Sequence, residues 1–292
     1  MQISPLRRRA GVLIILAVLM CLTGCQRLFD PLTDSARPAE PTTAPVNVVR
    51  VVTSWAALPL VESLRVAYID KHPTTLVQIE AIESRLANDL LQRGDADIAF
   101  SIDDTTGGSI TETIALAPRD QRQRVAADVM VIAVSVNTPI TNVSTAQLRD
   151  LYAGRIQTWD VLGGEAVRVE FVSREAGSAE RGLFDLAVMQ GESLSTAAVV
   201  LPSDAAVRDY LVSHPGALGY LSAAYVDARI KVVALDGYTP DPRVMTAGYY
   251  PLERTISVEL GPNAPQAARE FYELAISSQG CRIATERYIC RR

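Results

Sequence analysis

The feature that most limits the possible folds is the regular alternation of short apolar runs with helical stretches between residues 48 and 100. Apolar runs of this length predict buried strands, and the stretches between them carry apolar residues at helical spacing. Strands that alternate with helices form parallel sheets, whose loops gather at the carboxyl ends of the strands. The expected strands are residues 48–52, 76–81 and 96–100, and the expected helices are residues 59–71 and 83–94.

Three serines follow or lie near the ends of these strands. Ser54 follows the first strand, Ser84 the second and Ser101 the third. Open α/β sheets bind ligands at the edge where the carboxyl ends of their strands meet. We therefore expect these three loops to converge on a binding site.

The chain is long enough for two lobes. Residues 125–136 form an apolar run that could pass between lobes, and residues 255–260 form a strand that would return to the first lobe. Further strands are expected at residues 167–172, 199–201, 218–222 and 230–235. We predict an α/β protein with lobe 1 at residues 48–133 plus 248–292 and lobe 2 at residues 134–247.

The N-terminus is typical of a lipoprotein signal peptide. Three arginines at positions 7–9 precede an apolar segment that ends in Leu-Thr-Gly-Cys at Cys25. That segment is short for a membrane span, and its ending resembles the lipobox, in which the cysteine is lipidated. We expect residues 1–24 to be removed and residues 25–47, rich in Pro and Thr, to form a flexible tether on the extracytoplasmic face of a bacterial membrane. An uncleaved anchor helix is the alternative.

Several function classes have little support. The net charge is −5 and no basic stripe is visible, so nucleic acid is not an expected partner. His72 and His214 are remote and lack ligand spacing, so we expect no metal and no cofactor. Cys281 and Cys290 are most simply a disulfide in an exported protein. No catalytic set of Ser, His and Asp emerges, and an enzyme is therefore not expected.

The stretch from residue 171 to 184 is the main candidate for an anion site. A strand ending near Val172 is followed by Gly177 and Ser178, which fit a turn and a helix N-cap. Helix N-termini favour anions, and Arg174 could add a fork of donors to the same oxyanion. The alternative is an ordinary strand–helix joint in which Ser178 only caps the helix.

Five motifs, in order, resemble the phosphate-binding proteins of bacterial phosphate ABC importers. They are LRDLYAGRIQTWDVLGG at 148–164, SREAGSAER at 173–181, GALGYLS at 216–222, YPLER at 250–254 and SSQG at 277–280. The resemblance implies a two-lobed periplasmic-binding-protein-like (type II) fold, each lobe a mainly parallel sheet flanked by helices. It also implies a monomer that captures phosphate or a similar oxyanion, delivers it to permease subunits and catalyses nothing.

The resemblance assigns ligand-binding roles within the SREAGSAER stretch. Arg174 and Ser178 match the family's Arg and Ser, and Ala179 replaces a Gly but keeps its backbone N–H. Glu180 replaces a Thr. One hypothesis is that Glu180 accepts the proton of a P–OH group. The simpler interpretation is that Glu180 faces solvent or sits favourably in the first turn of the helix.

The first-lobe loops match only in part. Ser54 matches, but Ala56 lacks the family's hydroxyl, and Ile102 follows Ser101 where many members have Asp or Ser. Ser84 and Arg85 stand in place of a Gly/Ser-rich stretch, and an inward Arg85 would offset the charge of Glu180. These departures leave an alternative function open, in which the chain is a divergent sensor or cell-surface interaction module with a different ligand or none.

Overall fold

The structure is a computed structural model that describes residues 47–103, 122–241 and 248–290, and it leaves the side chain of Arg85 undescribed. The predicted signal peptide, the lipidation site at Cys25 and nearly all of the tether lie outside these residues. Among the described helices, none combines the length and the apolar character that a membrane span requires.

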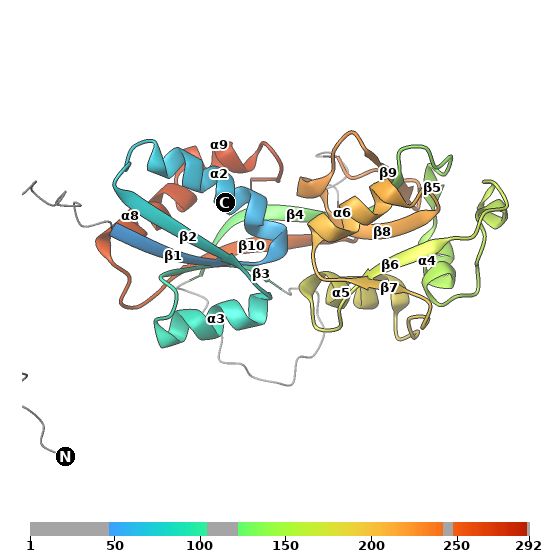
Figure 1. Cartoon of the computed structure of the whole chain (residues 1–292), viewed down its shortest axis with the longest axis horizontal. Coiled ribbons are helices and arrows are strands. Elements are labelled where there is room, and N and C mark those ends of the chain that lie inside the picture. Colours follow the sequence, from blue (N-terminus) through green and yellow to red (C-terminus); the bar gives the residue numbers. More distant parts are fainter. Residues whose placement is uncertain (1–46, 104–121, 242–247, 291–292) are drawn as a thin grey trace, which may run out of the picture. The chain divides into compact units, whose positions relative to one another are not determined.

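The first half of the sheet contains the predicted parallel strands. β1 (Asn47–Thr53) lies between β2 (Thr75–Ala81) and β3 (Ile98–Asp103) and is parallel to both. β10 (Glu253–Leu260) is antiparallel to β3. In Figure 1, α2 (Leu58–Ile69), α8 (Gln266–Ile276) and α9 (Ser278–Ala284) cover one face of these strands, and α3 (Ser84–Arg93) covers the other.

Alternation along β1 explains why helices cover both faces. Val51 belongs to the same apolar cluster as Leu60 and Leu64 of α2, whereas Val52 packs in a second cluster with Ala87 and Leu91 of α3. Successive side chains of a strand point to opposite faces, so an apolar pair in β1 buries itself against two different helices.

β4 (Arg122–Ser135) joins the two halves of the sheet, as the long apolar run predicted. Its residues 122–129 pair with β10, and its residues 130–135 pair with β8 (Ala217–Ser222) and β9 (Ile230–Leu235). The second half continues from β8 through β6 (Glu170–Arg174) to β7 (Val199–Leu201), all parallel, and β5 (Asn142–Val143) pairs with β9. Below, the first half of the sheet means β2, β1, β3 and β10, and the second half means β8, β6, β7, β9 and β5.

Helices cover both faces of the second half as well. Tyr220 of β8 stacks on Phe184 of α5 (Ala179–Phe184), with ring centroids 4.2 Å apart. The preceding residue, Gly219, faces α6 (Asp204–Ser213), where a Cβ would lie 2.9 Å from Val207. Glycine therefore permits the close approach of α6 to β8. α4 (Thr145–Tyr152) begins with a capping box between Ser144 and Gln147.

Several segments differ from the sequence prediction. The strand expected at residues 167–172 is β6, which begins three residues later and ends two residues later, at Glu170–Arg174. The third strand begins at Ile98, not at residue 96, because Asp97 binds the backbone N–H of Arg50 at 2.8 Å and its guanidinium at 2.6 Å. The helix that begins at Ala179 changes after Phe184 to a π-helix at Asp185–Met189. α9, whose N-cap is Ser277, lies in a region for which no element was predicted.

The predicted disulfide between Cys281 and Cys290 is present. It holds the segment after α9 close to the centre of the sheet. Ile289 exchanges backbone hydrogen bonds with Ala127 of β4 at 2.7 and 3.0 Å, and the hydroxyl of Tyr288 donates to the carbonyl of Ala56 at 2.6 Å.

Candidate functional site

Arg174 is held at the end of β6 by a buried aromatic group. The hydroxyl of Tyr220 accepts a hydrogen bond from the backbone N–H of Arg174 at 3.1 Å and contacts the hydroxyl of Ser173 at 2.8 Å. The side chain of Arg174 is 0% exposed. A fully buried guanidinium requires acceptors on most of its N–H groups, because an unpaired buried charge is costly.

The acceptors of Arg174 come from β7, the loop after it and α6. Nε donates to the carbonyl of Leu201 at 3.1 Å, and Nη2 donates to the carbonyl of Pro202 at 2.9 Å. Nη1 donates to Asp204 Oδ2 at 3.1 Å. Asp204 is the first residue of α6, directly after the N-cap Ser203. The short parallel pairing of β6 with β7 thus aligns the guanidinium with the start of α6.

Glu180 lies between Arg174 and a second buried arginine, Arg254 of β10. Its Oε2 is 3.3 Å from Arg174 Nη1, and its Oε1 accepts a hydrogen bond from Arg254 Nη1 at 2.8 Å. Ser178 caps α5, as predicted, by accepting from the backbone N–H of Arg181 at 3.2 Å. The cap directs the first turn of the helix, and therefore Glu180, toward the two arginines.

Asp128 and Ser222 close these contacts into a ring. Arg254 Nε donates to Asp128 Oδ2 at 2.8 Å, and the hydroxyl of Ser222 donates to Asp128 Oδ1 at 2.5 Å. The backbone N–H of Ser222 then donates to Asp204 Oδ1 at 2.7 Å. The side chains of this polar ring follow one another in the order Asp128, Arg254, Glu180, Arg174, Asp204 and Ser222.

The polar ring carries two positive and three negative formal charges, and these charges shift the pKa values of Glu180 and Asp204. Burial raises the pKa of Glu180, but the charges of Arg254 and Arg174 outweigh burial and hold it below its usual value. Burial and the neighbouring charge of Glu180 raise the pKa of Asp204 to about 6. Glu180 is therefore the more strongly ionised of these two acids.

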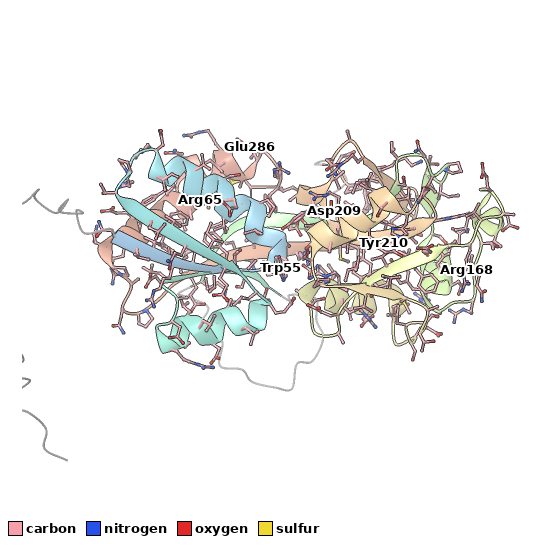
Figure 2. The ribbon with its side chains drawn as sticks, viewed as in Figure 1. Trp55, Arg65, Arg168, Asp209, Tyr210 and Glu286 are labelled. Carbon is pink, nitrogen blue, oxygen red and sulfur yellow. A yellow bond between two sulfur atoms is a disulfide. The ribbon has the colours of Figure 1, made fainter. Side chains whose placement is uncertain are left out.

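Loops of the first half of the sheet reach the same region. Glu83 Oε1 is 3.9 Å from Arg174 Nη2, is buried, and accepts no hydrogen bond within the described part of the chain. Burial and the charge of Glu180 raise the pKa of Glu83 to about 7. Figure 2 shows Trp55 where the two halves of the sheet meet, and its carbonyl accepts from the hydroxyl of Tyr225 at 2.6 Å.

The three serines predicted to converge do lie together. The backbone N–H of Ser54 donates to the carbonyl of Phe100 at 2.9 Å, next to Ser101. The hydroxyl of Ser84 accepts from the backbone N–H of Ile102 at 3.2 Å. The hydroxyl of Ser54 caps a 3-10 turn by accepting from Ala57 at 3.4 Å. The hydroxyls of Ser54 and Ser84 therefore already accept hydrogen bonds from backbone N–H groups.

Two other predicted site residues, Ala179 and Arg85, lie in the first turns of two different helices. Ala179 follows Ser178 at the start of α5, half-buried. Arg85 belongs to α3, but its side chain is outside the described part, so the expectation that it offsets Glu180 stays a prediction. The interpretation that Glu180 faces solvent is wrong, because its residue is 2% exposed and both arginines bind it.

Sequence reasoning missed four members of the polar ring: Asp128, Asp204, Ser222 and Arg254. Two lie within motifs that were recognised, Ser222 at the end of GALGYLS and Arg254 at the end of YPLER. Asp128 was visible as a lone acid inside the apolar run of residues 125–136. A buried acid in such a run needs a cationic partner, and this was the available signal.

Comparison with known proteins identifies relatives over most of the chain. A family model described as "PBP superfamily domain" matches residues 38–279. The phosphate-binding protein PstS of Bacillus subtilis (strain 168) is 23% identical over 242 residues, which cover 82% of this chain and 79% of that protein. PstS of Borreliella burgdorferi is 20% identical over 252 residues, which cover 82% of this chain and 88% of the relative.

Solved structures agree on the fold. A Clostridium perfringens protein solved with bound phosphate superimposes with a TM-score of 0.73 at 24% identity, covering 84% of this chain and all of that one. An ABC-type phosphate transport receptor from Vibrio cholerae gives a TM-score of 0.62 at 24% identity, over 83% of this chain and all of the receptor. Since the family model spans most of the sequence, the chain belongs to the periplasmic-binding-protein (PBP) superfamily and has the fold that the resemblance predicted.

Proposed function

We propose that this chain is an extracytoplasmic substrate-binding lipoprotein that captures phosphate or a similar oxyanion and delivers it to an ABC permease. The observation that carries the proposal is the buried guanidinium of Arg174, which lies at the end of β6 beside the first turn of α5. Relatives named as phosphate-binding proteins, each matched over most of its length, support the choice of ligand.

The two lobes, 48–133 with 248–292 and 134–247, would each contribute part of the site. Arg174, Ser178 and Ala179 would supply donors from the second half of the sheet, and the loops at Ser54, Ser84 and Ser101 would approach from the first half. Ser178 would have to release the carbonyl of Glu175, to which its backbone N–H and its hydroxyl donate at 3.2 and 3.0 Å. The contact between Glu83 and Arg174 supports this arrangement, because it joins the loop before Ser84 to the arginine. Closure of two lobes around a ligand is a common route to burying an anion among donors.

The remaining elements of the proposal concern the cell envelope. Cys25 would carry the lipid, residues 25–47 would hold the folded part away from the membrane, and the loaded protein would dock as a monomer on permease subunits. The chain would act by binding alone, without catalysis, in keeping with the names of its relatives. Mass spectrometry of the protein purified from membranes tests the anchor, with a diacylglycerol-modified Cys25 at the N-terminus as the expected result.

A second candidate function is a sensor or cell-surface module on the same fold. One observation favours it. The carboxylate of Glu180 already contacts both arginines of the polar ring, so the donors that a phosphate would use are engaged. Under this candidate the ring would hold the two halves of the sheet together and bind no oxyanion.

Titration calorimetry separates the two candidates. Inorganic phosphate is titrated into the full-length protein purified in detergent, and a saturable one-to-one isotherm with a dissociation constant below about 1 mM supports the binding protein. Sulfate serves as a second oxyanion and reports selectivity. Absence of heat with either anion, in a protein that remains folded by circular dichroism, favours the second candidate.

A further inference from the structure

The carboxylate of Glu180 stands between the two buried arginines, as an incoming oxyanion would. Its two oxygens are shared between the guanidiniums, with Oε1 2.8 Å from Arg254 Nη1 and Oε2 3.3 Å from Arg174 Nη1. Its own backbone N–H, in the first turn of α5, also acts on this carboxylate and helps to lower its pKa. A side-chain anion thus engages two buried guanidiniums, which are groups that recognise oxyanions through charge-assisted hydrogen bonds.

Most of the other donors of both arginines are already engaged. Arg174 gives Nε and Nη2 to the carbonyls of Leu201 and Pro202, and it shares Nη1 between Asp204 and Glu180. Arg254 gives Nε to Asp128, and its Nη2 lies 2.7 Å from the same carboxylate but makes no hydrogen bond within the described part of the chain. Within that part, a ligand could therefore take over the contacts of Glu180 and bind Arg254 Nη2 without breaking the frame of the ring.

The charge balance shows that Glu180 is not needed to neutralise the arginines. Without its carboxylate, Arg174 would keep Asp204 at 3.1 Å and Arg254 would keep Asp128 at 2.8 Å. Each buried cation would still have one buried anion. With Glu180 ionised, the ring carries an excess negative charge, and a second anion would add to it at close range, where the effective dielectric constant is low.

We infer that the carboxylate of Glu180 acts as an internal anion, which an oxyanion must displace from Arg174 and Arg254. The inference rests on the proposed function. Competition by Glu180 makes the affinity of the natural protein for phosphate lower than the ring would provide without this carboxylate.

The test compares phosphate affinity in three full-length variants with that of the natural protein. Glu180→Gln keeps the size of the side chain and removes its charge, and Glu180→Thr restores a hydroxyl and empties the space between the arginines. Asp185→Asn is the matched control, because it removes one acid near the end of α5 whose carboxylate contacts Arg181 and not the ring. Circular dichroism and thermal unfolding establish that each variant is folded.

We expect both Glu180 variants to bind inorganic phosphate at least about tenfold more tightly than the natural protein, and Asp185→Asn to bind it with unchanged affinity. Equal or weaker binding by the Glu180 variants, with binding by the natural protein intact, overturns the inference and leaves the proposed function standing. Absence of binding by all four folded proteins overturns the proposed function itself.

A measurement on the natural protein tests the displacement of Glu180 without any variant, and so it does not depend on whether the variants fold. Carbon-13 labelling of the glutamate carboxyl groups allows the resonance of Glu180 to be followed during phosphate titration. Displacement from two arginines changes the hydrogen bonds of this carboxylate, so the resonance should shift in proportion to the fraction bound. Saturation with phosphate without any shift would contradict the displacement that we infer.

Discussion

Arg254 lies directly opposite Asp128 across the β10–β4 pair, and its Nε donates to Asp128 Oδ2 at 2.8 Å. The two residues are cross-strand partners in the first half of the sheet. The other oxygen of Asp128 reaches Ser222 of β8, in the second half, and Arg254 Nη1 reaches Glu180. One cross-strand ion pair therefore links both halves of the sheet through two separate contacts.

Ser222→Ala should destabilise the protein by about 1–3 kcal/mol, because it leaves Asp128 Oδ1 buried without its donor. The hydroxyl also accepts from the backbone N–H of Ala224 at 3.2 Å, and that contact would be lost as well. Urea unfolding measures the change in the free energy of unfolding. Ser213→Ala is the control, since Ser213 is exposed at the end of α6 and its hydroxyl, among the described residues, contacts two backbone carbonyls and His214. A similar decrease in the free energy of unfolding in both variants would mean that the hydroxyl of Ser222 in the ring contributes no extra stability.

Arg174→Ala should lose detectable phosphate binding and also destabilise the protein by about 3–5 kcal/mol, because Asp204 would remain buried without its cation. Arg168→Ala is a matched control. Arg168 is exposed, and Figure 2 shows it far from Trp55, at the other end of the second half of the sheet. This control should keep phosphate affinity and change the free energy of unfolding by less than about 0.5 kcal/mol. Calorimetry and urea unfolding provide the two readouts, and phosphate binding by folded Arg174→Ala would remove Arg174 from the site.

Most of the strands could be predicted from the sequence because each one is marked by a local pattern of apolar residues. Residues 199–201 and 230–235 coincide with β7 and β9, and the expected strand at residues 48–52 differs from β1 by one residue at each end. These segments are short apolar runs with clear boundaries, so pattern and structure agree. The third strand shifted because Asp97 binds Arg50, a contact between residues that are 47 positions apart.

The polar ring could be predicted only in part. Arg174 stood within a recognisable motif, but Glu180 and Arg254 are 74 positions apart, and Asp128 and Arg254 are 126 apart. Pairings over such distances depend on the register of β4 against β10, which no local pattern specifies. The burial of Glu180 follows from this tertiary arrangement, and for that reason the sequence favoured an exposed position in the helix.

Reduction of the Cys281–Cys290 disulfide should lower the free energy of unfolding by about 2–3 kcal/mol. This is the stabilisation expected when a crosslink closes a loop of this length and lowers the entropy of the unfolded chain. The disulfide joins positions separated by nine residues. Urea unfolding with and without a reductant gives the change, and the variant with both Cys281→Ser and Cys290→Ser should match the reduced protein. The same variant should be insensitive to the reductant. An equal response of both proteins would show that the reductant acts elsewhere.

Asp204 should make the protein less stable as the pH rises from about 4 to 6. Its pKa in the folded protein is raised from its ordinary value of 3.8 to about 6, first by burial and then by the charge of Glu180. The folded state therefore holds a proton that the unfolded state has lost. Stability from this group is complete below the unfolded pKa and is lost as the pH rises through the folded pKa, by up to about 3 kcal/mol.

Urea unfolding between pH 4 and 8 measures this dependence, and Asp204→Asn should remove the decline that arises below pH 6. Glu83 contributes a decline of the same sign that extends to about pH 7, because its pKa is also raised, and this part should persist in the variant. Asp209→Asn is the control on the same helix, since Asp209 is exposed on α6 and its position is visible in Figure 2. The control should retain the full pH dependence. An unaltered decline in Asp204→Asn would show that Asp204 is already ionised in the folded protein and that the two arginines outweigh its burial.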